Sequence, residues 1–570
     1  MSLKKILPIA EWLPSYKNSD LKSDLSAGLT VGVMLIPQGM AYAMLAKLPA
    51  IYGLYAATLP LILYAIFGTS RQLSVGPVAM ASLLVASGLS PLVSSENNLE
   101  QYIKMAVLLA FLVGIVRLLL GILRMGFLVN FISRPVINGY TSAAALIIGL
   151  SQLKHLLGIK IPNSNYIHEV LYHTFLNLNN IQILTLIIGI VGIVLLLVLK
   201  FIKKKYKIDI PGPLAVVFFG TITVWGFGLT DFGVSIIGDV PKGLPSVMVP
   251  YFDWKTVQML IPSAFMIGIV GFMESISVAK VIQSKHKTYT VSANQELIAL
   301  GIANMGGAFF QAFPVNGGFS RTAVNDQAGA KTPLAGVFSA VLVLLTLLFL
   351  TPLFYYLPQA VLASIVMVAV FNLIDIQEVK FLWKSNKKDL MMLIITFLAT
   401  LFIGVVEGIL VGVFCSLILL IYRATVPHIA ILGKVPDTEV YRNISRNVNL
   451  EQRKDILIIR FDAELFFGNA DYFSEYIQNK IKDSSPTPRL LIIDAESITG
   501  IDATAMYNVT ELYRDLEKQN ILCYWAELKG PVRDSMELAG AKDIIGKENF
   551  FVTVQDAVDN FDNLTRKYNK

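Results

Sequence analysis

The hydrophobic pattern divides the chain into a long apolar part and a shorter polar part, and the change lies near residue 428. From Asp24 the next charged residue is Lys47 and the one after it is Arg71, so two stretches of more than 20 uncharged residues follow each other. As a helix, each is long enough to cross about 30 Å of hydrocarbon. Further apolar segments follow, and the full set is 25–46, 51–68, 74–92, 104–124, 137–153, 182–200, 212–228, 258–280, 294–310, 334–353, 358–373, 390–406 and 408–424. The pattern predicts an α-helical polytopic membrane domain over 25–428, preceded by a polar cytoplasmic segment at 1–24.

After residue 428 the pattern changes to short β-rich runs that alternate with amphipathic helical stretches. The runs lie at 455–462, 488–498 and 521–528, and the helical spacing lies at 469–481 and 502–520. Strands that alternate with helices are typical of a small, mostly parallel sheet. We therefore expect one α/β domain over 436–565, of a size normal for a single domain.

Composition and charge agree with a membrane protein. The 570 residues are 55% hydrophobic and 15% charged with a mean hydropathy of +0.62, whereas soluble domains carry about a quarter charged residues. Lys and Arg outnumber Asp and Glu by 29 to 17 before residue 430, and the ratio is 18 to 23 after it. The positive balance thus belongs to the membrane part and is no nucleic-acid footprint. Its basic clusters, at Lys4–Lys5, 200–207, 280–287 and 380–388, are predicted on the cytoplasmic side, and 94–101 and 228–257 outside. This distribution places the chain in the cell (inner or plasma) membrane with both termini in the cytoplasm.

Two apolar segments are interrupted by helix-breaking residues, LSVGPVAMASLL at 73–84 and QAFPVNGGFSRTAVND at 311–326. A weak internal repeat places them in corresponding positions, because 31–43 aligns without gaps with 267–279 about 45 residues upstream, with Gln38 opposite Glu274. Paired broken helices in two halves indicate a binding site near the bilayer midplane.

The second interrupted segment carries candidate anion-binding groups. A helix that starts after Gly317-Gly318 would leave the backbone N–H groups of Phe319, Ser320 and Arg321 free, and a second half-helix beginning near Val75 would face it. Each N-terminus contributes about half a positive charge. Arg321 would add a full charge, and Ser320 and Thr322 hydroxyl donors. The alternative is an exposed loop with a solvated arginine, but irregular backbone at membrane depth has to be buried or line a cavity.

An acidic residue inside an apolar span costs about 2.5–3.5 kcal/mol on insertion scales, so Glu274 is expected to face a cavity and serve function. It could carry a proton, or it could form a cation site with Ser275, Ser277 and backbone carbonyls; a structural hydrogen bond or an ion pair with Arg321 is the alternative. Gln38 and Tyr42, one helical turn apart, could line the anion pocket or join helices.

Other chemistry has little support. His155, His168 and His173 lie in a predicted external loop without metal-ligand spacing, and Cys415 and Cys523 indicate packing. No phosphate-binding GxxxxGK[ST] pattern and no defensible catalytic triad occurs. We therefore predict no enzyme activity, metal or cofactor.

The strongest motifs together resemble the sulfate permease (SulP) or solute carrier 26 anion transporters. They are GLTVGVMLIPQGMAYAMLAKLPAIYGLYA (28–56), GTSRQLSVGPVAM (68–80), SRPVINGYTSAAAL (133–146), ELIALGIANMGGAFFQAFPVNGGFSRTAVNDQAGAKT (296–332) and a C-terminal region similar to a STAS domain. The resemblance implies 14 helices in a 7+7 inverted repeat, with half-helices 3 and 10, a mobile core domain, a gate domain, elevator-type movement and a homodimer.

The resemblance also implies the site. The anion would lie between the starts of half-helices 3 and 10, formed by Val75, Gly76, Pro77, Val78 and Ala79 and by Phe319, Ser320, Arg321 and Thr322, with Gln38 and Tyr42 lining the pocket. Glu274 matches the cation-coupling position, and a glutamate there is more similar to proton-linked than to sodium-linked members. The STAS region departs from related phosphorylated domains, since Ala503 follows Asp502 where they carry serine. It is therefore expected to serve as a dimer platform or to bind a cytoplasmic protein partner.

These observations predict a secondary transporter of a small inorganic or organic anion. Sulfate is the first expectation, bicarbonate the second and a dicarboxylate the third, with coupling to protons or sodium, or exchange for another anion. Two alternatives of another class remain: a channel-like or electromotile protein that binds chloride, and an anion sensor that signals through the STAS domain.

Overall fold

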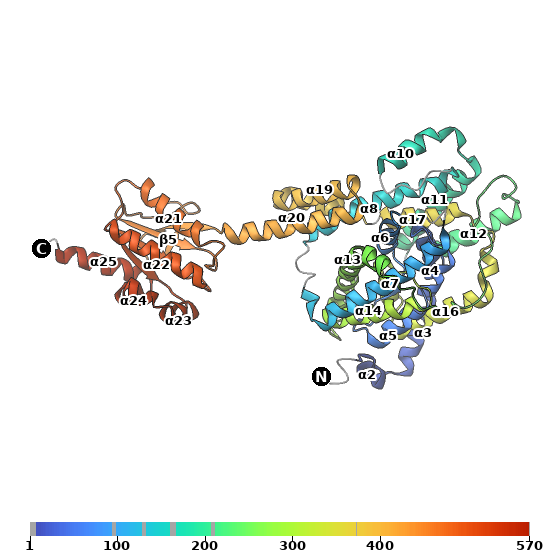
Figure 1. Ribbon diagram of the computed structural model, residues 1–570, viewed down its shortest axis with the longest axis horizontal. Coiled ribbons are helices and arrows are strands. Elements are labelled where there is room, and N and C mark those ends of the chain that lie inside the picture. Colours follow the sequence, from blue (N-terminus) through green and yellow to red (C-terminus); the bar gives the residue numbers. More distant parts are fainter. Residues whose placement is uncertain are drawn as a thin grey trace. The chain divides into compact units, whose positions relative to one another are not determined.

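The computed structural model describes residues 7–93, 98–127, 133–159, 167–206, 211–371 and 373–568. They fall into two compact units, Met1–Ser416 and Leu417–Lys570. The first unit is helical apart from one pair of two-residue strands, and the second is α/β (Figure 1).

The first unit contains the following elements: α2 (Ile9–Trp12), η1 (Leu13–Ser15), α3 (Asn18–Leu45), α4 (Ile51–Tyr55), α5 (Leu59–Phe67), β1 (Val75–Gly76), α6 (Ala79–Leu89), α7 (Leu99–Ile122), α8 (Arg134–Ser151), α9 (Leu153–Leu157), α10 (Ile167–Leu176), η3 (Leu178–Asn180), α11 (Ile183–Tyr206), α12 (Gly212–Gly226), α13 (Trp254–His286), α14 (Ala293–Ala308), β2 (Asn316–Gly317), α15 (Phe319–Gln327), α16 (Leu334–Leu345), η4 (Thr346–Leu350), η5 (Thr351–Phe354), α17 (Gln359–Phe371), α18 (Ile376–Ser385) and α19 (Lys387–Phe402). Helix α20 (Val405–Thr425) runs from the first unit into the second.

The helices follow the predicted apolar segments closely. Within the described residues, eight helical stretches are long and apolar enough to cross a membrane, and three shorter apolar ones accompany them. Helix α3, which contains the first predicted apolar segment, begins at Asn18 and not at residue 25. The Lys17 N–H donates to the Asp20 carboxylate (3.1 Å) and caps the polar first turn of this helix. The predicted segment 51–68 is divided into α4 and α5. The count of 14 helices stays a prediction.

The helix that follows each interrupted segment packs against helices from the other half of the first unit. Helix α7 packs against α13 and α14, while α16 packs against α3 and α5. Small residues allow the close approach: a Cβ built on Gly114 would lie 2.8 Å from the Gly301 carbonyl oxygen, and one on Gly28 would lie 2.5 Å from that of Ala335. The helix after each broken segment therefore packs against the first helices of the other half, as an inverted repeat requires.

A second group of helices consists of α8, α11, α12, α17 and α19. Helix α8 packs against α17 and α19, and α11 packs against α12 and α17. Helices α11 and α20 carry many exposed large apolar side chains, among them Ile187, Val191, Phe414 and Ile421. Such faces suit lipid or a second copy of the chain.

The second unit contains β3 (Ile429–Lys434), β4 (Tyr441–Asn443), β5 (Ile456–Phe461), α21 (Ala470–Asp483), β6 (Leu490–Asp494), α22 (Ala503–Lys518), β7 (Leu522–Ala526), α23 (Gly530–Leu538), α24 (Ala541–Ile545), η6 (Lys547–Asn549), β8 (Phe550–Phe551) and α25 (Val554–Tyr568). The strand order is β4-β3-β5-β6-β7-β8, parallel from β5 to β8, with β3 antiparallel to both its neighbours. The predicted strands and helices are present. The sheet is mixed, and its strand β3 lies before the predicted start at 436.

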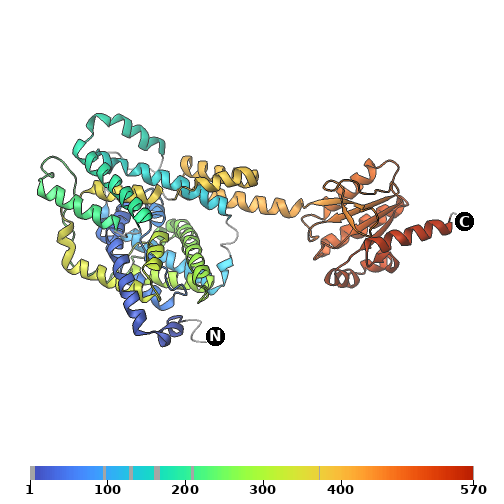
Figure 2. The same ribbon diagram turned by 180° about the vertical axis from the view of Figure 1, so that it is seen from behind.

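Side-chain alternation along the strands explains how the helices cover this sheet. Ile459, Leu491 and Ile493 point to the face covered by α21 and α22, whereas Ile458 and Ile492 point to the face covered by α25. The red C-terminal helix in Figures 1 and 2 is α25.

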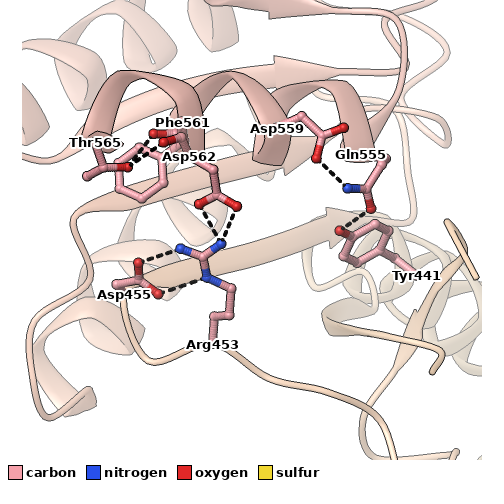
Figure 3. Close-up of polar contacts among 8 residues, drawn as sticks. All are labelled: Tyr441, Arg453, Asp455, Gln555, Asp559, Phe561, Asp562 and Thr565. Atoms are coloured by element: carbon pink, nitrogen blue, oxygen red, sulfur yellow. Dashed lines mark hydrogen bonds and ion pairs between the residues drawn. The ribbon is translucent and has the colours of Figure 1, made fainter. Parts of the chain in front are cut away.

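Polar contacts hold α25 against the sheet face that it covers (Figure 3). Arg453 bonds both carboxylate oxygens of Asp562 (2.6 and 2.8 Å) and those of Asp455 (3.1 and 2.7 Å), while the Tyr441 hydroxyl donates to Gln555 (2.9 Å). The Arg453 guanidinium holds the pKa of Asp455 below its usual range. A bidentate network of this kind fixes orientation more effectively than a single surface pair.

Candidate functional site

A short antiparallel ladder joins the two interrupted segments. Val75 pairs with Gly317 and Gly76 with Asn316, and the Gly318 N–H donates to the Ser74 carbonyl (2.9 Å). Segments more than 240 residues apart therefore meet in one two-stranded sheet inside the helical unit.

Local sequence explains why the chain is extended here and helical afterwards. Pro77 lacks an N–H and disfavours helix in the residue before it. Gly76 has φ of +152°, a conformation that side chains rarely adopt. A Cβ on Gly318 would lie 2.9 Å from Nη2 of Arg321, so the glycine makes room for the guanidinium. Helices α6 and α15 then begin within three residues of the ladder.

The ladder is antiparallel, so α6 and α15 leave it in opposite directions, and because it is only two residue pairs long, both helices start close to it. The first N–H bonded within α15 is that of Thr322, which donates to the Gly318 carbonyl (3.0 Å), and in α6 it is that of Ser82, which donates to Val78 (3.0 Å). The preceding N–H groups of each helix point toward its start. Two such termini supply about one positive charge together.

Arg321 lies between the two half-helices. Its side chain is buried, its Nη1 donates to the Pro77 carbonyl (2.7 Å), and within the described residues its Nε and Nη2 have no hydrogen-bond partner. These two nitrogens form one edge of the guanidinium, the edge that binds an oxyanion in bidentate fashion. The predicted extra charge is thus at the junction of the two segments.

The other predicted residues of α15 are placed differently from one another. Phe319 (61% exposed) and Ser320 are exposed at the helix start, whereas Thr322 is buried. The Thr322 Oγ1 accepts the N–H of Ser74 (3.0 Å). This bond joins the opposite segment and holds the ladder, and because an accepting hydroxyl keeps its own proton, Thr322 as a hydroxyl donor to the anion stays a prediction. On the α6 side, Val75 to Ala79 are all buried.

Gln38 and Tyr42 of α3 are buried, Glu274 of α13 is half-buried, and both helices pack against α15. In the part of the chain that the structure describes, the Gln38 Oε1 and Glu274 Oε2 have no hydrogen-bond partner. Tyr42 has Arg321 and Glu274 as charged neighbours, and those of Glu274 include Arg321. No described contact is a direct ion pair between Glu274 and Arg321, so the structure lends no support to that alternative.

Two serines considered as cation ligands serve the backbone. The Ser275 hydroxyl donates to Gly271 (2.6 Å) and accepts the Gly317 N–H (2.8 Å), and the Ser277 hydroxyl donates to the Met273 carbonyl (2.7 Å). Ser275 thus ties α13 to β2.

Carboxylates on full-length helices fix the loops beside both half-helices. Glu296 of α14 accepts the N–H groups of Thr69 (2.7 Å) and Ser70 (3.1 Å), upstream of α6. Asp24 of α3 accepts the N–H groups of Lys331 (2.6 Å) and Thr332 (3.0 Å), downstream of α15. Each half of the repeat therefore holds the broken segment of the other.

Sequence reasoning missed three residues of this region. Arg117 of α7 is fully buried and bonds β2, the Asn316 side chain leaves its Nδ2 without a described partner, and the buried Tyr140 hydroxyl of α8 has Glu274 as a charged neighbour. Arg117 had a usable signal, because it is a charge inside the apolar segment 104–124. Tyr140 and Asn316 had none.

The predicted histidine loop is partly corrected. His155 lies in α9, is half-buried, and its Nδ1 is 3.1 Å from Oε1 of Gln359 at the start of α17. It is an interhelical contact and not a surface residue. The His168 side chain lies outside the described residues.

Comparisons with known proteins identify the family. A family profile described as the sulfate permease family matches residues 21–396, and a STAS domain profile matches 447–557. The chain belongs to the sulfate permease family.

Relatives match this permease family member over almost its full length. It is 38% identical over 567 residues to "Sulfate transporter 4.1, chloroplastic" of Arabidopsis thaliana, which covers 97% of this chain and 82% of the relative. It is 34% identical over 576 residues to "High affinity sulfate transporter 2" of Stylosanthes hamata, covering 98% and 86%. Relatives of this chain are transporters and not enzymes.

Solved structures show the same fold. The murine solute carrier 26 family member A9 anion transporter, in the inward-facing state, superposes with a TM-score of 0.89 at 27% identity and covers 97% of this chain and 93% of that one. The transmembrane domain of the cyanobacterial bicarbonate transporter BicA gives 0.60 at 24% identity, covering 70% and 98%, and supports the fold alone. The permease is thus a multi-pass helical membrane transporter with a C-terminal STAS domain.

Proposed function

We propose that this sulfate permease family member is a secondary active transporter of sulfate or a related oxyanion. One observation carries the proposal: two half-helices start at one antiparallel ladder, where a buried arginine keeps Nε and Nη2 without a described partner. An oxyanion between these groups would accept N–H bonds from both helix starts and a bidentate bond from Arg321. The sulfate transporters among the relatives make sulfate the first substrate to test.

Each predicted residue has a specific part in this proposal. Phe319, Ser320 and Ala79 contribute the helix starts, and Gln38 and Tyr42 close the pocket from α3. Glu274 couples transport to a proton, because a half-buried carboxylate with Arg321 among its charged neighbours changes the charge of the site when it is protonated. Sodium coupling and anion exchange are the alternatives.

The larger movement follows from the two helix groups. We propose that the group carrying the ladder moves as an elevator against the group formed by α8, α11, α12, α17 and α19, and that the permease is a homodimer in the cell membrane with cytoplasmic termini. The packing of helices within each group and the exposed apolar faces of α11 and α20 support it, and the two groups meet where α12 and α17 contact α3. Because one relative is chloroplastic, the membrane that holds this permease has to be determined by direct localisation.

Uptake by proteoliposomes tests the proposal. Radiolabelled sulfate is supplied with and without imposed proton and sodium gradients, and unlabelled bicarbonate and fumarate serve as competitors. We expect sulfate accumulation that rises with an inward proton gradient. Stronger competition by bicarbonate or fumarate would reassign the substrate, and binding without uptake under every gradient would favour the sensor alternative.

A further inference from the structure

Arg117 is a second buried cation beside the candidate site. It lies in the middle of α7, is fully buried and makes four hydrogen bonds. Nε donates to the Gly268 carbonyl (3.1 Å), Nη1 to that of Val315 (3.1 Å), and Nη2 to that of Ile267 (3.0 Å) and to Oδ1 of Asn316. All four acceptors are neutral oxygens, so these bonds orient the guanidinium but leave its charge uncompensated.

The position of Arg117 relative to the site follows from the elements it binds. From Val315 to Gly318 there are three residues of extended chain, about 10 Å. On the other side, Glu274 lies seven residues after Ile267 on α13, two turns along the same face and about 10 Å of rise. The charged neighbours of Glu274 include both Arg117 and Arg321. Arg117 therefore acts on the site through its charge and not through contact.

Counting these charges gives the site a specific preference. Two arginines, the two helix starts with about one positive charge together, and one ionised Glu274 leave about two positive charges, and protonation of Glu274 leaves about three. Burial of an uncompensated cation is costly, and an anion nearby offsets that cost. A doubly charged oxyanion offsets two of these charges, whereas a singly charged anion offsets one.

We propose that Arg117 is a specificity-determining residue that makes the site favour a divalent oxyanion over monovalent anions. The inference rests on the proposed transport function and adds the charge class of the substrate. Coulomb energy scales with ligand charge. Loss of Arg117 therefore reduces the binding free energy of a divalent anion by twice as much as that of a monovalent anion. At about 10 Å and an effective dielectric constant of about 20, the affinity ratio of divalent to monovalent anion falls roughly tenfold.

The test measures selectivity in the full-length permease. Arg117→Gln is compared with wild type in proteoliposomes, using labelled sulfate with unlabelled sulfate or bicarbonate as competitors, and by ligand-dependent thermal shifts in detergent. Arg117→Lys keeps the charge, and Lys104→Gln removes an exposed charge from the same helix. We expect the sulfate-to-bicarbonate affinity ratio to fall about tenfold in Arg117→Gln and to be close to wild type in the other two. An unchanged ratio in folded Arg117→Gln would overturn the inference.

A second pair of variants tests the charge if Arg117→Gln does not fold. In a Glu274→Gln background, position 274 carries no charge, so loss of Arg117 does not leave an ionised carboxylate there with one cation fewer. Glu274→Gln/Arg117→Gln should show a ratio roughly tenfold below that of Glu274→Gln alone in the thermal-shift measurement, and equal ratios would refute the role of Arg117. Failure of the transport proposal is distinct, since wild type itself would then take up none of the anions.

Discussion

One nitrogen of the Arg321 guanidinium, Nη1, donates a hydrogen bond to the Pro77 carbonyl, and two others, Nε and Nη2, are left for a ligand. The bond from Nη1 to Pro77 sets the plane of the group, and the neighbouring Gly318 leaves room for it. An arginine that is already buried and oriented loses little side-chain entropy when an anion arrives. At this scale, the chemistry of the site depends on single donors.

Replacement of Arg321 tests this arrangement. Arg321→Gln removes two charge-assisted hydrogen bonds, and we expect sulfate affinity to fall roughly 100-fold, which corresponds to about 3 kcal/mol. Arg321→Lys keeps the charge without the planar fork and should lose less. Competition binding in detergent measures both, with thermal unfolding as the control for folding. Equal affinities in wild type and the glutamine variant would remove Arg321 from the site.

Glu274 is expected to govern coupling and not binding alone. Glu274→Gln preserves the size of the side chain but removes its proton and charge, so gradient-driven accumulation of sulfate should be lost while exchange of labelled for unlabelled sulfate persists. Both are measured in the same proteoliposomes. Proton-driven uptake that survives in this variant would defeat the coupling role.

At the scale of elements, the short ladder has to be held at a fixed place between long helices. Ser275 and Arg117 bind β2 from α13 and α7, and Glu296 and Asp24 hold the loops that precede α6 and follow α15. These bonds satisfy backbone groups that would otherwise be unpaired at membrane depth. The two-residue strands persist because other helices supply their partners.

Close packing of β2 on α13 gives an element-scale prediction. A Cβ on Gly271 would lie 2.1 Å from the Asn316 Nδ2, so Gly271→Ala should displace β2, lower the melting temperature and weaken sulfate binding. Gly336→Ala on α16 is the matched control, because no atom lies within 4 Å of its Cβ position. There the helix should gain up to about 1 kcal/mol. Melting curves for the two variants decide the matter, and equal behaviour would show that β2 tolerates the displacement.

For the whole molecule, the two units have separate hydrophobic cores. The large core of the first unit and the two cores on the faces of the STAS sheet share no residues. The membrane unit should therefore fold and bind its anion without the sheet.

Truncation tests this independence. A cut at 436 would leave β3 without its partners β4 and β5, and an unpaired strand promotes aggregation. The better end point is Thr425, the last residue of α20. We expect anion affinity within about twofold of the full chain by thermal shift, which is under 0.5 kcal/mol, with lower expression or a lower uptake rate. Complete loss of binding would contradict the division into two units.

Local sequence patterns are enough to predict the membrane class, the positions of the long helices, three of the STAS strands (β5, β6 and β7) and the two interrupted segments. All of these follow from local patterns, because helix length, apolar runs and Gly or Pro breaks act within a few residues of one another. Helix α3 begins at Asn18, earlier than predicted, because an apolar pattern does not include the polar residues of its capped first turn.

Which polar groups meet depends on how distant segments pack in the folded chain. Arg321 bonds Pro77 across 244 residues and Arg117 bonds Val315 across 198, and no periodicity along the chain contains such pairings. The same holds for Thr322, whose hydroxyl serves the ladder, for His155, which joins α17, and for β3, whose place in the sheet depends on β5. The partner of a polar group at membrane depth is set by whichever distant segment packs beside it, since the lipid offers none.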